Sequence, residues 1–78
     1  MIELRFSLKT HKTEREAYSA FERAKNLLGD HKIPFKMDIF NQEFFITTDF
    51  VGKLEMSRVY KIVFYCESDL TAYQLIKD

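Results

Sequence analysis

The chain has 78 residues, which is enough for one domain and leaves no room for a second core. With 46% hydrophobic residues, two Gly and one Pro, the composition predicts a single globular domain over residues 1–78 and excludes a disordered chain. The 12 basic and 12 acidic side chains cancel. Because proteins that bind duplex DNA normally carry a basic excess, duplex DNA is not an expected partner.

The cysteine content and the N-terminal sequence indicate the compartment. Cys66 is the only cysteine and cannot form an internal disulfide, which favours a reducing environment. The first residues alternate charged and apolar side chains instead of forming the apolar run of a signal peptide. No window reaches the length of a membrane span. We therefore expect a soluble, cytoplasmic protein with no membrane contact.

The first third of the chain predicts a strand followed by a helix. Apolar and polar residues alternate from Ile2 to Leu8, as in a strand with one buried face. Thr13 and Glu16 match a capping box, and helical spacing then continues to about residue 28. Gly29 follows, which predicts a helix that ends in a left-handed residue. The residues expected to face the core are Ala17, Phe21, Ala24 and Leu28.

The middle of the chain predicts a β-hairpin with its turn at Asn41-Gln42. Apolar residues alternate over residues 35–40 and again over residues 43–50. A two-residue turn sets Ile39 opposite Phe44, so that the apolar positions of both strands share one face. A slightly longer loop stays open as an alternative, because Asn-Gln is not the usual dipeptide of such a turn.

Residues 58–66 predict the strand at the centre of the sheet. Both alternating sets in this stretch are largely apolar, which is typical of a strand covered on both faces or flanked by other strands. A helix is the weaker interpretation, because some of its apolar residues also fit helical spacing. Residues 51–56 are ambiguous between a turn, a short helix and the start of this strand. Ser68 is a candidate N-cap for a short C-terminal helix.

Together these elements predict an α+β fold in the order strand, helix, strand, strand, strand, helix. The long helix covers one face of a four-stranded antiparallel sheet, and the short helix follows at the C-terminus. If residues 51–58 are helical, the order becomes that of a ferredoxin-like fold, which is the alternative. The side chains expected under the helix are Ile2, Leu4, Phe6, Met37, Ile39, Phe44, Ile46, Ile62 and Phe64.

On the other face of this sheet, the sequence predicts a partner-binding surface with aromatic anchors and lysines around them. Exposed apolar patches are a sign of association, and aromatic anchors tend to dominate the energetics of interfaces. The residues assigned to this surface are Phe40, Phe45, Tyr65, Lys36 and Lys61.

The same aromatic and basic face gives a second hypothesis, which is stacking of single-stranded RNA bases. The acidic residues Glu3, Asp38 and Glu43 are expected on this face too and would repel phosphate. RNA is therefore the less favoured partner.

No catalytic, cofactor or metal motif stands out in the sequence. His11 and His31 fall in loops at opposite ends of the predicted helix, roughly 25 Å apart at 1.5 Å per residue, which is too far for one metal ion. Cys66 is interpreted as inert packing in an apolar strand. We expect no enzymatic activity, no cofactor and no metal.

The expected function is that of a small binding module, a regulator or inhibitor that docks on another protein. Two alternatives stay open: a single-stranded RNA-binding domain that uses the same face, and a homodimeric structural protein in which a second copy hides it. In its Lys- and Phe-rich, Gly-poor character the chain is similar to small accessory proteins of bacteriophages. That similarity covers no motif and assigns no residue.

Overall fold

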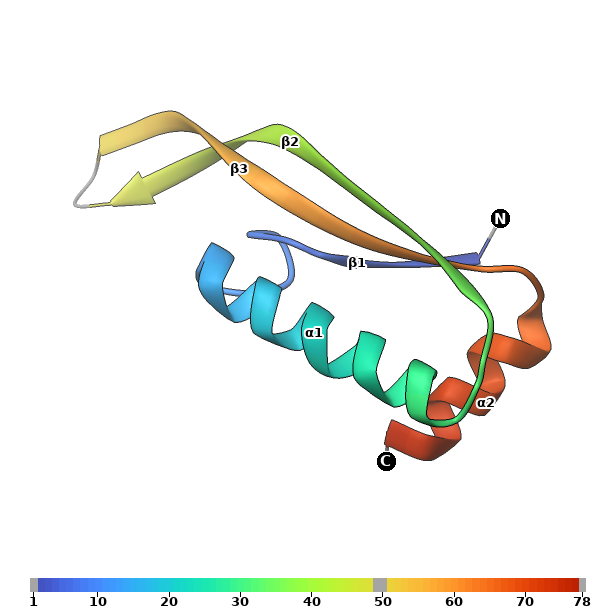
Figure 1. Ribbon diagram of the computed structural model, residues 1–78. Coiled ribbons are helices and arrows are strands. Elements are labelled where there is room, and N and C mark those ends of the chain that lie inside the picture. Colours follow the sequence, from blue (N-terminus) through green and yellow to red (C-terminus); the bar gives the residue numbers. More distant parts are fainter. Residues whose placement is uncertain (1, 49–50, 78) are drawn as a thin grey trace.

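A computed structural model describes residues 2–48 and 51–77 of the chain. Two helices pack under one face of an antiparallel sheet, which gives the α+β architecture expected from the sequence (Figure 1). The elements in chain order are β1 (Ile2–Phe6), α1 (Glu14–Asp30), β2 (Phe35–Thr48), β3 (Val51–Phe64) and α2 (Glu67–Lys77).

Strand β3 is the centre of the sheet, as the sequence predicted for residues 58–66. The strand order is β1-β3-β2, and both neighbours run antiparallel to β3. Ile62 is fully buried, with Leu4 of β1 on one side and Met37 of β2 on the other. The register therefore places Tyr60, Ile62 and Phe64 on the face that the helices cover.

Over residues 2–48 and 51–77 the sheet has three strands and not the predicted four, because the chain does not turn at Asn41-Gln42. These two residues lie inside β2, opposite Arg58 and Ser57. The pairing of β2 with β3 continues without a break from Phe35 to Thr48. Residues 51–58 belong to β3, so the ferredoxin-like alternative is also wrong.

A change of buried face explains why the sequence suggested a turn. Apolar residues occupy odd positions in the first part of β2, such as Ile39, and even positions further on, such as Phe44. Odd and even positions of one strand point to opposite faces, so Phe44 does not share the face of Ile39. Phe44 is nevertheless buried, and so are Ser57 and Val59 of β3 on the same face. Two-stranded ribbons twist strongly, and this twist lets the two halves of the hairpin bury opposite faces.

The loop after β1 is fixed against β3 where β1 ends. β1 stops at Phe6 instead of Leu8, and Ser7 is buried at the start of the loop. The Thr13 side chain accepts a hydrogen bond from the Glu16 backbone N–H at 3.1 Å, which confirms the predicted helix cap. The Glu14 carboxylate accepts a hydrogen bond from the Arg58 backbone N–H at 2.9 Å and so ties the start of α1 to β3.

Lys32, and not Gly29, supplies the left-handed residue after α1. Its φ is 56°, whereas Gly29 lies within the helix and has no positive φ. The Ile33 N–H donates to the Leu28 carbonyl and the Lys32 N–H to the Gly29 carbonyl, which is the Schellman pattern. The left-handed position therefore falls on a residue with a Cβ, at a conformational cost.

The core lies between α1, α2 and the face of β3 that carries Ile62. The four α1 residues predicted to face the core are all buried. Tyr73 of α2 closes the cluster, with its ring centroid 6.0 Å from that of Phe64. None of the helices described is long and apolar enough to cross a membrane.

Replacement of Lys32 by glycine is expected to stabilise the protein by about 0.5–1 kcal/mol, because glycine adopts the left-handed conformation without the Cβ penalty. Urea unfolding followed by circular dichroism measures this change. Asp30→Gly is the matched control. A glycine at position 30 lies inside the helix, where it should destabilise the protein. A Lys32→Gly variant no more stable than the wild type would contradict this account of the helix end.

Candidate functional site

The structure separates the five residues that the sequence assigned to one surface. Phe40, Lys36 and Lys61 lie on the sheet face opposite the helices. Phe45 is five positions beyond Phe40 and therefore points to the other face. Tyr65 follows the end of β3, eleven residues from the partner of Phe45, which at about 3.3 Å per residue is roughly 36 Å away along the strand. Phe45 and Tyr65 cannot belong to one small docking surface.

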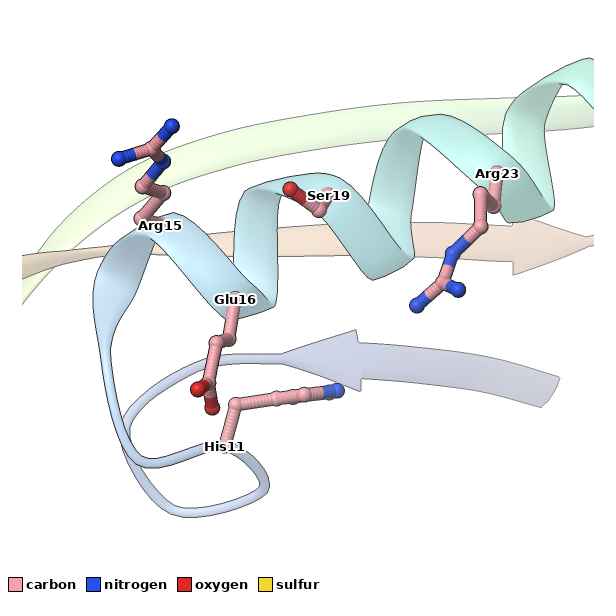
Figure 2. A pocket seen from close by; sticks show the side chains of 5 residues that line it. All are labelled: His11, Arg15, Glu16, Ser19 and Arg23. Atoms are coloured by element: carbon pink, nitrogen blue, oxygen red, sulfur yellow. The ribbon is translucent and has the colours of Figure 1, made fainter.

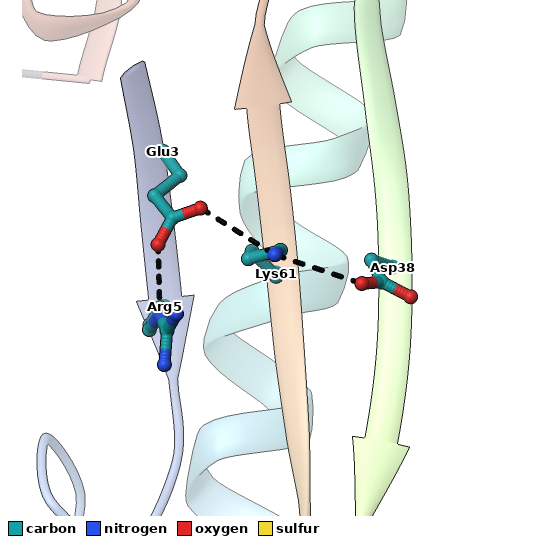
Figure 3. Close-up of polar contacts among 4 residues, drawn as sticks. All are labelled: Glu3, Arg5, Asp38 and Lys61. Atoms are coloured by element: carbon teal, nitrogen blue, oxygen red, sulfur yellow. Dashed lines mark hydrogen bonds and ion pairs between the residues drawn. The ribbon is translucent and has the colours of Figure 1, made fainter. Parts of the chain in front are cut away.

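The uncovered face holds a cluster of ion pairs around Lys61 (Figure 3). The Lys61 ammonium lies 3.5 Å from the Glu3 carboxylate and 3.6 Å from that of Asp38. Arg5 donates to Glu3 at 2.9 Å. The Phe40 ring lies beside both cations, with its centroid 5.9 Å from the Arg5 guanidinium carbon and 5.7 Å from Lys61 Nζ.

These contacts neutralise Arg5 and Lys61 on the uncovered face. The hydrogen bond from Arg5 holds the pKa of the Glu3 carboxyl below its usual value against the opposing effect of desolvation, and Lys61 acts in the same direction as Arg5. Glu3 is thus an anion at neutral pH, and with Asp38 it balances the two cations. A phosphate backbone would have to compete with both carboxylates for Lys61.

The outer half of the β2–β3 hairpin carries a second surface, of which the sequence analysis had assigned only Phe45 to partner binding. The hairpin extends beyond the end of β1 and the start of α1, and this accounts for the long dimension of a molecule that measures 44 × 23 × 15 Å (Figure 1). Leu54 is directly opposite Phe45, and Met56 is the diagonal neighbour of Phe45 on the same face. We call Phe45, Leu54 and Met56 the hairpin patch. Their exposed fractions are 69%, 65% and 59%.

Gly52 holds Phe45 in place by leaving room for its ring. A Cβ on Gly52 would lie 2.8 and 2.9 Å from Phe45 Cε1 and Cε2, and closer still to Cζ, all inside van der Waals contact. The ring therefore rests on the glycine backbone across the hairpin. An exposed aromatic side chain that is fixed in this way loses less conformational entropy when it binds a partner than a freely rotating one.

A shallow hollow lies beside the first turns of α1, lined by His11, Arg15, Glu16, Ser19 and Arg23 (Figure 2). The Arg15 guanidinium points away from the hollow, whereas the Glu16 carboxylate points toward the His11 side (Figure 2). An anion in this hollow would face that carboxylate. The His11 ring stacks on the Phe6 ring, with 6.1 Å between the ring centroids. His11 Nδ1 also lies 2.8 Å from Thr10 Oγ1, so both contacts give the His11 ring a structural role.

Cys66 is exposed, so its predicted role as packing in an apolar strand is wrong. It lies between β3 and α2, where its sulfur is 3.0 Å from the Ser68 hydroxyl oxygen. A hydroxyl is not a base that would activate the thiol. Among residues 2–48 and 51–77, no group of three or more His, Cys, Asp or Glu side chains is placed to hold a metal ion.

Comparison of the chain with models of protein families, with curated proteins and with solved structures finds no match. The functional argument therefore rests on the geometry of the surfaces described above.

Gly52→Ala is expected to destabilise the wild-type protein and to be neutral or stabilising when Phe45 is also replaced by alanine. The backbone at Gly52 has no positive φ and accepts alanine, and the atoms nearest to the new Cβ belong to the Phe45 ring. Urea unfolding of the two single variants and the double variant should give a coupling energy of about 0.5–2 kcal/mol. A coupling energy near zero would show that the ring does not rest on Gly52.

Proposed function

We propose that the protein is a small non-enzymatic binding module that docks on another protein through the hairpin patch. The observation that carries this proposal is the Phe45 ring, which is exposed but held against Gly52 beside the equally exposed Leu54. Aromatic anchors that are rigid before binding contribute strongly to interfaces. A regulator or inhibitor needs this kind of surface and no reacting groups.

The position of the patch supports the same proposal. It lies on the outer half of the hairpin, which projects from the body (Figure 1), and the side chains of Phe45, Leu54 and Met56 are all more than half exposed. Charged neighbours of both signs border it on the same face: Glu43 is opposite Met56, and Arg58 is the next β3 residue on that face. An apolar centre with a polar rim is the usual anatomy of a protein interface.

The single-stranded RNA alternative has less support. Base stacking needs aromatic rings next to cations that are free to meet phosphates. On the sheet face opposite the helices, the ring next to cations is Phe40, and its neighbours Arg5 and Lys61 are already paired with carboxylates. The hairpin patch has an exposed ring and mixed charges, which suits a protein partner better than a polyanion.

Phe45→Ala is expected to abolish capture of the partner protein, because it removes the central anchor of the hairpin patch. The immobilised protein is incubated with a lysate of the source cells, and the retained proteins are identified by mass spectrometry. Leu54→Ala should weaken capture of the same proteins. Circular dichroism confirms that each variant is folded.

Tyr65→Ala is the matched control, since Tyr65 is an aromatic residue with a similar exposed fraction of 71% at the opposite end of β3. This variant should retain the same proteins as the wild type. If the Phe45→Ala variant retained them as well, the hairpin patch would not be the docking surface.

A further inference from the structure

The helix layer is displaced toward β1 and leaves the helix face of β2 exposed at Met37 and Ile39. In the register, Phe35, Met37 and Ile39 share the helix face with the buried residues of β3. Met37 and Ile39 are nevertheless 49% and 52% exposed, whereas their counterparts Leu4 and Phe6 on β1 are partly buried against the core. One side of the sheet is sheltered and the other is not.

The position of α2 explains this asymmetry. Tyr73 and Lys77 of α2 line one hollow together with Phe6 of β1 and with the flank of α1 that carries Ala20 and Leu27. The opposite flank of α1 carries Tyr18, whose ring packs on Tyr60 and is otherwise half exposed. Both helices thus cover the β1 side of the sheet. The surface of Met37 and Ile39 on β2, which we call the apolar shelf, stays exposed.

The free edge of β2 adjoins this shelf. In the part of the chain that the structure describes, β2 is the last strand of the sheet, so one row of its backbone N–H and C=O groups faces outward without a partner strand. Natural proteins usually protect such edges with charged side chains, especially Lys, or with bulges or prolines. The charged residues here are Lys36 and Asp38, which have opposite signs and lie on the face away from the helices. The first five residues of β2 contain no proline, and they pair with β3 in a regular register. This segment is available to pair with another strand.

We propose that the free edge of β2 pairs with β2 of a second copy of this chain. The two strands run antiparallel around a twofold axis at Met37. In this register Met37 lies opposite itself and Phe35 opposite Ile39 of the other copy, all on the helix face. On the other face, Lys36 lies opposite Asp38 of the other copy. All these contacts are compatible with a symmetric interface. Each one joins either two apolar side chains or two side chains of opposite charge.

Neighbouring registers lack this complementarity. Opposed residues must have the same parity if the helices of both copies are to lie on one side of the joined sheet. A twofold axis at Lys36 or at Asp38 would place that charged residue opposite its own copy, so that two like charges would meet. Axes from residue 39 to residue 41 each set Glu43 against an apolar side chain of the other copy, namely Phe35, Met37 or Ile39 in turn. The zero net charge of the chain adds no long-range repulsion between copies.

The dimer leaves the hairpin patch free. The paired segment covers the first five residues of β2, and Pro34 precedes it, so the ladder does not extend far beyond. Because the two strands run antiparallel, the outer halves of the two hairpins project in opposite directions. The dimer thus exposes two copies of the patch, and its existence does not depend on the patch binding anything.

Charge substitution at the edge tests both the dimer and its register. Sedimentation equilibrium of the wild type across the micromolar range should show a mass approaching twice the chain mass of 9.4 kDa. Lys36→Glu alone and Asp38→Lys alone should each weaken self-association at least about tenfold, since each sets two like-charge pairs across the axis. An equimolar mixture of the two variants should regain the dimer, because both cross-axis pairs then carry opposite charges.

A wild type that stays monomeric would overturn the proposal. A dimer that is insensitive to the single substitutions, or a mixture that fails to regain it, would equally overturn the Met37 register. Circular dichroism checks that both variants are folded, which matters because Asp38 also pairs with Lys61.

Cysteine cross-linking tests the axis independently. In a Cys66→Ser background, Met37→Cys should form a disulfide-linked dimer on mild oxidation, because directly opposed Cα atoms lie within disulfide range. Ile39→Cys in the same background is the control, since its two copies would be about 13 Å apart along the strands and should not cross-link. Equal cross-linking of the two variants would contradict the register.

Discussion

The structure depends on the unbroken pairing of β2 with β3 over 14 positions. This pairing makes β3 the central strand and decides which side chains meet the helices. It also makes the hairpin far longer than β1, so its outer half cannot be covered by the body. The hairpin patch follows from this mismatch between a long ribbon and a short first strand, whereas the exposure of Met37 and Ile39 follows from the displacement of the helices toward β1.

The two surfaces differ in chemistry because the ribbon twists. Near its base, the helix face contains Met37 and Ile39 beside a free edge, which suits the addition of a strand. Further out, the same face contains Phe45 above Gly52, which suits insertion of an aromatic anchor into a partner's pocket. On the opposite face near the base, Lys61 and Arg5 are paired with carboxylates of the same chain. Ion pairs within the chain thus dominate one face of the sheet, and exposed apolar side chains dominate the other.

Local signals predicted the elements that are built from local interactions. The Thr13 cap and the buried positions of α1 follow from hydrogen bonds and spacing within one helix, and the structure confirms them. The centrality of residues 58–64 also followed from their apolar content. The turn at Asn41-Gln42 was wrong because a change of apolar phase looks the same whether the chain reverses or the ribbon twists.

The candidate site was predictable only in part, since its residues depend on that same distinction. With the false turn, Phe40 and Phe45 were assigned to one face, whereas the true register sets them on opposite faces. Leu54 and Met56 were missed although the sequence carries a signal for them. They stand at even positions, in phase with Tyr60, Ile62 and Phe64, and so continue the alternation of the central strand backward. Phe50, which was predicted to lie on the face of Phe44, is outside the described residues.

Interstrand nuclear Overhauser effects give the most direct test of the continuous hairpin. The backbone protons of Asn41 and Arg58, and those of Phe40 and Val59, should show contacts between opposed strands. Contacts between Ile39 and Phe44, together with the absence of those to β3, would instead place a turn at Asn41-Gln42. That result would contradict the face assignment on which both proposed surfaces rest.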